Sequence, residues 1–325
     1  MSTATPPEVI TVTLNPAIDR TVTIPDFEAG KVNRVEQAQD HPGGKGVNVA
    51  VALADAGHRV AVTGFLGREN VTTFEDLFAR KGIADQFVRI AGRTRVGIKI
   101  ADPLRDQTTD INFPGPAPAP ADLAALRERL AASAAPWAVL AGSLPPGVAP
   151  DLYAELVAML KAGGRRVALD TSGEPLRHAL AATPHLIKPN IHELEALVGA
   201  PLPDAAAVLA AAQGLLARGV ELVVVSMGGE GALFIARGRV VRARPPAVTV
   251  RSTVGAGDAM VAGIVAAQLR GLPLDEGARL ATAFAVDAIS RLGAGLSAPA
   301  TIAALAAQVA VEPLEVAPPA RPAAR

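Results

Sequence analysis

Short apolar runs alternate along this chain with longer amphipathic stretches. The runs that have the length and β-branched content of buried strands are residues 9–14, 59–63, 137–141, 165–170, 185–188 and 221–226. Helical patterns lie between them at 151–162, 191–198 and 205–218, and the chain after Ala256 has an almost entirely helical pattern. This rhythm predicts an α/β fold in which helices cover both faces of a mostly parallel sheet.

Two early segments break that rhythm, because residues 20–24 and 95–101 alternate with a period of two. Between 95 and 100 the odd positions are charged or glycine, and the even positions are valine or isoleucine. With residues 110–113, which follow a turn at 102–106, they predict a small antiparallel sheet with one polar and one apolar face. Two interpretations stay open. The sheet is either a hairpin resting on the main core, or a lid with its polar face over a substrate and its apolar face against a second subunit.

Composition excludes several classes of function. The 31 basic and 31 acidic residues cancel and only 3% of residues are aromatic, so the chain lacks the features of a nucleic-acid-binding protein. It has no cysteine, which excludes disulfides, thiolate metal sites and a cysteine nucleophile. Residues 1–7 lack the pattern of a signal peptide, and no run reaches the roughly 18 uncharged apolar residues of a membrane span. We therefore expect a soluble cytoplasmic protein with no membrane partner.

The strongest local motif is Ser-Thr-Val-Gly-Ala-Gly-Asp at 252–258, directly before the apolar helical segment 259–269. Glycines at a helix start leave backbone N–H groups free to bind an anion, and the helix dipole adds to this effect. Asp258 beside them could accept a proton from an alcohol during phosphoryl transfer. The alternative is a glycine-rich loop with an aspartate near the helix N-cap. No Walker sequence is present.

Three further motifs have both a structural and a functional interpretation. Glycines, a lysine and an asparagine at 41–48 form either a strand-to-helix turn or a close approach to a ligand. Asn190 and Glu193 share a helical face, so they form either a capping box or a site that orders water around Mg²⁺. The Ser-Met-Gly-Gly-Glu-Gly sequence at 226–231 is either a hairpin turn or a cradle for nucleotide phosphates. Gly64 and Gly67 indicate a hinge or tight turn.

Four polar residues fall where predicted strands end. They are Asp19, Ser143, Lys188 and Ser226. Ligands of an open parallel sheet bind at the carboxyl ends of its strands, so we expect these side chains to lie near one cavity. A carboxylate in that place, such as Asp19, can hold two sugar hydroxyls, although a solvated turn is the simpler interpretation.

The motifs at 15–19, 43–48, 142–147, 188–193 and 253–258 occur in an order that resembles the PfkB branch of the ribokinase-like sugar kinases. Segments 64–70, 92–99 and 108–113 are most similar to bacterial 1-phosphofructokinases. The resemblance implies a doubly wound α/β domain over residues 8–312. Its lid is expected to be formed by residues 19–40 and 93–113. The proline-rich composition of residues 113–120 predicts a linker, and we expect residues 1–7 and the proline-containing segment 313–325 to be disordered tails. It also implies ATP-dependent phosphorylation of fructose 1-phosphate at the 6-hydroxyl, giving fructose 1,6-bisphosphate. Tagatose-6-phosphate kinase and the 6-phosphofructokinase of this branch are the alternatives.

The same resemblance assigns roles to individual residues. Asp258 is the expected base and Gly255, Ala256 and Gly257 the expected anion hole. The sugar is expected on Asp19, Gly43, Gly44 and Asn48, and its phosphate near Lys31, Lys45, Arg95 and Ser143, with Lys99 and Asn112 on the same lid face. ATP is expected on Lys188, Asn190, Ser226, Gly228, Gly231 and Gly257, with Mg²⁺ at Asn190 and Glu193.

The resemblance further implies a homodimer whose lids clasp and cover Ile98, Ile100, Ile111 and Phe113. Two rival functions are a silent sugar-phosphate sensor and a kinase of neutral sugars or nucleosides. The intact motif at 255–258 argues against a sensor. The cations Lys31, Lys45 and Arg95 argue against a neutral substrate.

Overall fold

The computed structural model describes residues 5–291 and 293–314. Within them, an eleven-stranded sheet has the order β15-β14-β13-β12-β11-β10-β9-β1-β4-β5, and β6 also pairs with β4. The strands are β1 (Val9–Thr13), β4 (Val60–Gly67), β5 (Ala84–Asp85), β6 (Val88–Ile90), β9 (Trp137–Ala141), β10 (Arg166–Asp170), β11 (Leu186–Ile187), β12 (Leu222–Ser226), β13 (Ala232–Ala236), β14 (Arg239–Arg244) and β15 (Ala310–Leu314). Pairing is parallel from β5 to β12 and antiparallel from β12 to β15.

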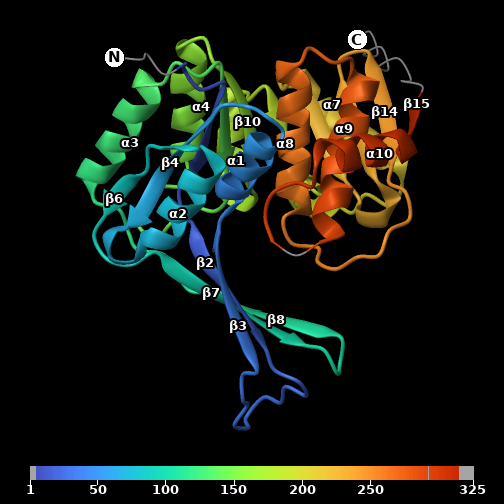
Figure 1. Cartoon of the computed structure of the whole chain (residues 1–325). Coiled ribbons are helices and arrows are strands. Elements are labelled where there is room, and N and C mark those ends of the chain that lie inside the picture. The colour runs from blue at the N-terminus through green and yellow to red at the C-terminus, as the bar shows by residue number, and fades with distance from the viewer. Residues whose placement is uncertain (1–4, 292, 315–325) are drawn as a thin grey trace.

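Helices cover both faces of this sheet (Figure 1). One face packs against α1 (Lys45–Asp55), α2 (Thr72–Lys81), α8 (Ala256–Leu269), α9 (Leu274–Ile289) and α10 (Pro299–Gln308). The other packs against α3 (Pro120–Ala132), α4 (Leu152–Ala162), α5 (Gly173–Ala179), α6 (Ile191–Val198) and α7 (Ala205–Ala217). Alternate residues of the central strands belong to the two apolar clusters, as a strand buried on both sides requires. The doubly wound α/β fold is confirmed.

Several sequence expectations need correction. β4 continues through Gly64, so no turn lies there, and it ends at Gly67, where a short 3₁₀ turn at Arg68–Asn70 follows. Gly64 lies so close to the Thr13 carbonyl that a Cβ would come within 1.9 Å. The region after Ala256 also contains a strand, β15, which pairs with β14 and extends to Leu314, two residues past the boundary expected at 312. Residues 5–7 have no regular secondary structure, and residues 1–4 and 315–325 of the two expected tails lie outside the described chain.

A separate four-stranded sheet projects from the main body (Figure 1). Its strands are β2 (Ala17–Thr23), β3 (Gln37–Gly43), β7 (Arg95–Asp102) and β8 (Gln107–Ile111), in the order β3-β2-β7-β8. We call these four strands and their loops the lid. The expectation of a fully antiparallel sheet is wrong, because β2 and β7 pair in parallel. Both strands leave the body in the same direction after parallel strands of the main sheet, and β3 and β8 run back antiparallel beside them.

The lid has the two faces expected from its alternation. Ile98 pairs with Ile111 on one face, and Lys99 with Asp110 on the other. Val22, Ile24 and Ile100 are each 7% exposed and pack against Phe27 and Ile98. The lid loop therefore covers part of the apolar face itself, whereas Ile111 and Phe113 are 43% and 46% exposed.

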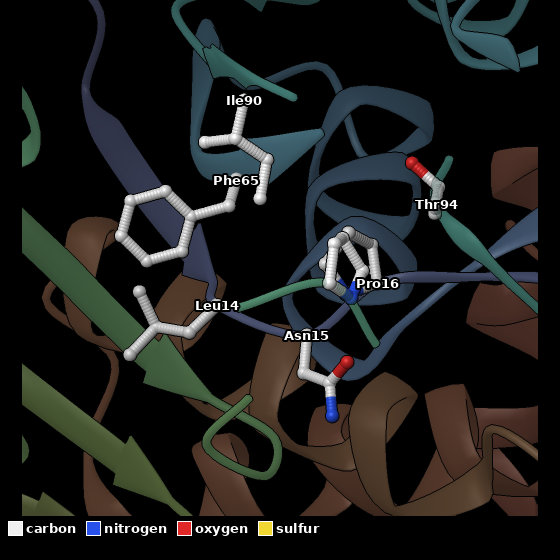
Figure 2. A pocket seen from close by; sticks show the side chains of 7 residues that line it. Leu14, Asn15, Pro16, Phe65, Ile90 and Thr94 are labelled. Atoms are coloured by element: carbon white, nitrogen blue, oxygen red, sulfur yellow. The ribbon is translucent and has the colours of Figure 1, made fainter. Parts of the chain in front are cut away.

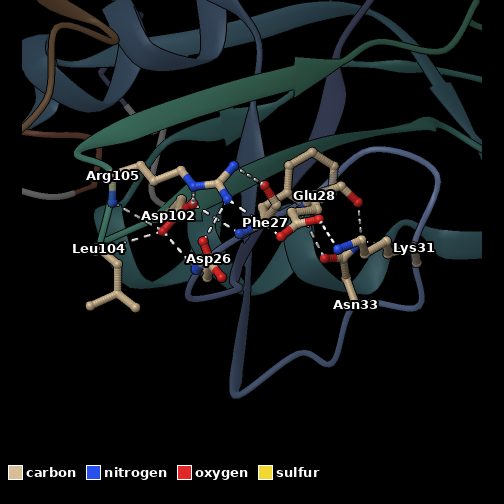
Figure 3. Close-up of polar contacts among 8 residues, drawn as sticks. All are labelled: Asp26, Phe27, Glu28, Lys31, Asn33, Asp102, Leu104 and Arg105. Carbon is tan, nitrogen blue, oxygen red and sulfur yellow. Dashed lines mark hydrogen bonds and ion pairs between the residues drawn. The ribbon is translucent and has the colours of Figure 1, made fainter.

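Figure 3 shows how that loop is held. The buried carboxylate of Asp102 accepts hydrogen bonds from the backbone N–H groups of Asp26, Phe27, Leu104 and Arg105. Arg105 in turn donates to the Asp26 carboxylate at 2.6 Å and to the Phe27 carbonyl at 2.8 Å. These bonds join the loop after β2 to the β7–β8 turn, so the two lid hairpins form one unit. No helix of the described chain is long and apolar enough to cross a membrane.

Candidate active site

A cavity of about 560 Å³ opens at the carboxyl ends of the parallel strands, where the lid meets the body. The predicted site residues that line it are Asp19, Gly44, Lys45, Asn48, Arg95, Ser143, Lys188, Asn190, Glu193, Ser226, Gly255, Gly257 and Asp258. Residues far apart in the sequence thus meet at one place, as the strand-end argument predicted. Thr13, Asn15, Thr171 and Ser172 also line the cavity and were not predicted, although each lies at or just after a strand end.

The helix that follows the glycine motif begins at the cavity. α8 starts at Ala256, and its N-cap Gly255 has a φ of 82°, a left-handed conformation that favours glycine. No side chain caps this end. A Cβ on Gly257 would lie 3.2 Å from Nζ of Lys188, so the helix start and an ammonium group are neighbours. The start of α8 can therefore bind an anion, because it combines free N–H groups, the dipole of a fourteen-residue helix and a nearby lysine.

Asp258 lies in the first turn of α8 and is 6% exposed. Burial raises the pKa of its carboxyl to about 7, with a second contribution from the negative charge of Asp170. A hydrogen bond from Asn48 and the charges of Lys45 and Lys188 partly oppose that rise in pKa. A carboxylate with a pKa near neutrality is well matched to general-base catalysis.

Asn48 contacts this carboxylate directly. Its Nδ2 donates to Oδ2 of Asp258 at 2.7 Å, across 210 positions of sequence. Asn48 is expected to bind the sugar, and the structure adds a contact that orients the expected base. The other carboxylate oxygen, Oδ1, is not used in that hydrogen bond.

A buried aspartate that is not among the predicted site residues joins two of the predicted lysines. Asp170 is 1% exposed, with Nζ of Lys45 at 3.3 Å from its Oδ2 and Nζ of Lys188 at 3.6 Å from its Oδ1. Burial opposes the charge on Lys45, but the carboxylates of Asp170, Asp258 and Glu193 raise the pKa of its ammonium above the ordinary value. Asp170 closes a predicted strand, which is the one sequence signal that could have indicated it.

The lid end of the cavity holds Asp19 and Arg95. Burial raises the pKa of the Asp19 carboxyl, although Lys99 and Arg95 oppose the rise. Gly43 lies against Asp19, where a Cβ would fall 2.1 Å from Oδ2. Arg95 donates to the Asn15 carbonyl at 3.2 and 3.4 Å, and within the described chain it has no salt bridge to a carboxylate. Burial lowers the pKa of this guanidinium.

Asn15 lies where the body becomes the lid. Its Nδ2 donates to Oγ of Ser143 at 3.2 Å. It also borders a second, much smaller cavity of about 10 Å³, shown in Figure 2, lined by Leu14, Asn15, Pro16, Phe65, Ile90, Thr94 and Pro116. That volume is the size of one water molecule. The small cavity is mostly apolar, so the ligand-sized space is the larger one.

Other predicted residues do not line the large cavity. They are Lys31, Gly43, Lys99, Asn112, Gly228, Gly231 and Ala256. Lys31 pairs with Glu28 in the lid loop with its side chain 68% exposed, and Lys99 pairs with Asp110 at 3.5 Å. Gly228 and Gly231 flank the turn of the β12–β13 hairpin, where a Cβ on Gly231 would lie 2.0 Å from the Ala243 carbonyl. The hairpin interpretation of 226–231 is confirmed.

The Asn190–Glu193 pair forms the capping box that the sequence analysis considered. Oδ1 of Asn190 accepts from the Glu193 N–H at 2.8 Å, and Oε2 of Glu193 accepts from the Asn190 N–H at 2.9 Å. The described residues contain no group of three or more His, Cys, Asp or Glu side chains that could hold a metal. Mg²⁺ commonly keeps several waters and binds through one or two carboxylates and substrate phosphates, so Glu193 at the cavity fits such a site.

Comparison with known proteins agrees with this geometry. Residues 11–301 match the model of the pfkB family carbohydrate kinases. The chain belongs to the pfkB family of carbohydrate kinases. This kinase is 52% identical to 1-phosphofructokinase of Rhodobacter capsulatus over 309 residues, covering 94% of this chain and 98% of the relative.

Two solved structures share its fold. One is a possible 1-phosphofructokinase from Thermotoga maritima, with a TM-score of 0.85 and 30% identity, covering 94% of this kinase and 99% of that chain. The other is phosphofructokinase-2 from Escherichia coli in complex with fructose-6-phosphate, with a TM-score of 0.86 and 30% identity, covering 93% and 98%. The resemblance inferred from the five motifs is confirmed.

Proposed function

We propose that this pfkB kinase transfers the γ-phosphoryl group of ATP to the 6-hydroxyl of fructose 1-phosphate, giving fructose 1,6-bisphosphate. The observation that carries the proposal is the placement of Asp258, buried in the cavity at the start of α8, in a chain 52% identical to a 1-phosphofructokinase. It combines a general base and an anion-binding helix start, the two parts that phosphoryl transfer to an alcohol requires.

Asp258 takes the proton from the attacking hydroxyl as the new O–P bond forms. Asn48 holds Oδ2 of that carboxylate, which leaves Oδ1 to accept the proton of the hydroxyl. The N–H groups at the start of α8, with Lys188 beside Gly257, stabilise the charge on the phosphoryl group in transfer. Their fixed positions contribute because they need no reorganisation when the charge develops.

Arg95 is the best candidate for reading the phosphate that the sugar already carries. It lines the cavity, is partly buried and lacks a carboxylate salt bridge among the described residues, whereas Lys45 and Lys188 both face Asp170. A guanidinium binds a phosphate through paired hydrogen bonds. Ser143 and Asp19 lie in the same cavity, and we assign them to the sugar phosphate and the sugar hydroxyls respectively.

Mg²⁺ and ATP complete the proposal. Glu193 is the proposed residue for water-mediated binding of Mg²⁺, which when bound neutralises charge on the nucleotide phosphates. Asn190 and Ser226 border the cavity near Lys188 and are assigned to the nucleotide side. An ATP-consuming sugar kinase of this type is proposed to act in the cytoplasm.

The lid supports a proposed homodimer. Ile111 and Phe113 expose large apolar side chains on it, as do Val32, Val35 and Leu104. Such an exposed apolar surface is unfavourable in water, and a second lid is the partner we propose for it. The kinase domain is taken to span residues 8–314, which include β15, with the lid as an insertion.

The test is an ADP-release assay that compares fructose 1-phosphate, fructose 6-phosphate, tagatose 6-phosphate and fructose. The proposal predicts the highest kcat/KM for fructose 1-phosphate and very low turnover of unphosphorylated fructose, because Arg95 would lose its anionic partner. A higher kcat/KM for either of the other two phosphosugars would assign this site to that sugar instead.

A further inference from the structure

Asp170 is a buried aspartate that lies next to the large cavity without lining it. It ends β10, between β9 and β11 in the middle of the main sheet, and only 1% of it is exposed. Its Oδ1 has no hydrogen-bond partner within the described chain. An ionised carboxylate in such a place is unfavourable unless other charges compensate for it.

Two lysines supply that compensation, one for each carboxylate oxygen. Lys45 comes from α1 and lies 3.3 Å from Oδ2, and Lys188 follows β11 and lies 3.6 Å from Oδ1. Both lysines line the cavity, and Asp170 does not. The buried carboxylate therefore lies behind the cavity wall, in contact with the ammonium groups of two residues of that wall.

The other groups around Asp170 leave this arrangement intact. On α4, the Tyr153 hydroxyl donates to the Gly142 carbonyl at 3.0 Å, so it is not engaged with the carboxylate. On α8, Asp258 is a second negative group under the influence of the same two lysines. On α6, Glu193 acts on Lys45. The site thus contains two lysines shared by two buried aspartates, of which the mechanism above uses only Asp258.

We propose that Asp170 is a positioning residue, whose buried carboxylate anchors the ammonium groups of Lys45 and Lys188 so that both point their remaining N–H donors at phosphate groups in the cavity. An ammonium has three donors, so Lys45 keeps two after its hydrogen bond to Asp170, and Lys188, whose contact with Asp170 is an ion pair at 3.6 Å, keeps all three. A free lysine side chain samples many rotamers, and an anchor beneath it removes this freedom before the ligand arrives. The inference rests on the proposed phosphotransferase function.

Asp170 also affects Asp258 through space. Its negative charge is one cause of the raised pKa of Asp258, and the two lysines oppose that rise. Removing the charge at Asp170 therefore lowers the pKa of Asp258, whereas removing Lys188 raises it. These opposite shifts in the pKa of Asp258 distinguish a positioning role from a merely structural one. A simple loss of packing would not move that pKa in opposite directions in the two variants.

The test compares Asp170→Asn with a matched control, Asp287→Asn. Asp287 is also a buried aspartate, with Arg291 at 3.2 Å, but it does not line the cavity. Asp170→Asn should weaken ATP binding, measured by calorimetry, by about tenfold and raise both KM values, since each substrate loses a preset cation. On a plot of kcat against pH, the acid limb is the fall of kcat at pH values below the pKa of Asp258. In Asp170→Asn this limb should move down by about one pH unit. Asp287→Asn should lower thermal stability and change neither quantity.

Wild-type ATP affinity and a wild-type acid limb in Asp170→Asn would overturn the proposal. If that variant does not fold, Lys188→Met decides, because the acid limb must then move upward, and an unchanged limb refutes the coupling. The calorimetric arm uses ATP alone. It is therefore readable even if fructose 1-phosphate is not the substrate, which separates this proposal from the proposed function.

Discussion

Replacing Asp258 by asparagine removes the proton acceptor and keeps the size of the side chain. With a pKa of about 7, Asp258 is half ionised at neutral pH, so the wild-type kcat should fall about tenfold for each pH unit below that value. Asp258→Asn should lower kcat by roughly 10²–10⁴, equivalent to about 3–5 kcal/mol in the barrier, and change both KM values far less. The remaining slow rate should lose the acid limb.

The same pKa predicts the effect on stability. The folded carboxyl titrates near 7 and the unfolded one near 3.8, so between these values the folded state binds more protons. Stability therefore falls as pH rises through this window, by roughly 4 kcal/mol in all. An asparagine has no charge to bury, so the variant should unfold at a higher temperature than the wild type at pH 8.

Stopped assays with fructose 1-phosphate from pH 5.5 to 8.5, together with thermal unfolding at pH 5 and pH 8, test both consequences. A less active but equally or more stable variant separates lost chemistry from lost folding. A kcat within tenfold of wild type, or an acid limb that persists in the asparagine variant, would refute the assignment of Asp258 as the base.

Three further predictions concern the other parts of the site. Arg95→Ala should raise the KM for the phosphosugar by roughly tenfold or more and the KM for ATP much less. The control Arg127→Ala, at a surface pair with Glu155, should change neither KM. A change confined to the KM for ATP would contradict the assignment. Ile111→Asp should yield monomers in sedimentation with reduced activity, and a monomeric wild type at micromolar concentration would exclude the lid interface. Glu193→Gln should raise the Mg²⁺ concentration needed for half-maximal rate severalfold while the neutral side chain still caps α6, so an unchanged Mg²⁺ dependence would remove Glu193 from the metal site.

The parallel half of the sheet could be predicted because its signal is local. The strand β9 and the helix α6 begin and end at the predicted residues, since an apolar run of strand length or a helical period is visible within one segment. The β13–β14 hairpin and β15 were missed. β14 carries arginines at 239, 242 and 244, and β15 contains Pro313, so neither of these two strands resembles a buried run. β13 is itself a short apolar run and could have been recognised.

The lid shows what alternation can and cannot establish. The period of two correctly assigned Ile98 and Lys99 to opposite faces, because that depends only on the geometry of one strand. Parallel pairing of β2 with β7 depends on where each strand leaves the body, and this is a property of the whole fold. The hydrogen bonds to Asp102, which hold the lid loop over part of the apolar face, are equally non-local.

For the site, the strand-end rule located the cavity but could not assign the contacts within it. Nothing near Asn48 indicates that it donates to a carboxylate 210 positions away, and nothing near Asp170 indicates that two lysines meet on it. The first contact arises because α1 and α8 start at the same edge of the sheet, one after each glycine motif. The second arises because β10 and β11 end at that edge beside the start of α1.

The capping box at Asn190 shows that structural and functional interpretations of one motif need not compete. Its hydrogen bonds use Oδ1 of Asn190 and Oε2 of Glu193, one acceptor on each side chain, and fix both side chains at the cavity wall. A carboxylate that caps a helix is already fixed in one rotamer. It therefore loses little further side-chain freedom when it binds the water shell of a cation. The capping role thus holds Glu193 in place for the proposed binding of Mg²⁺. The presence of the capping box therefore does not weaken the prediction that Glu193 helps to bind the metal.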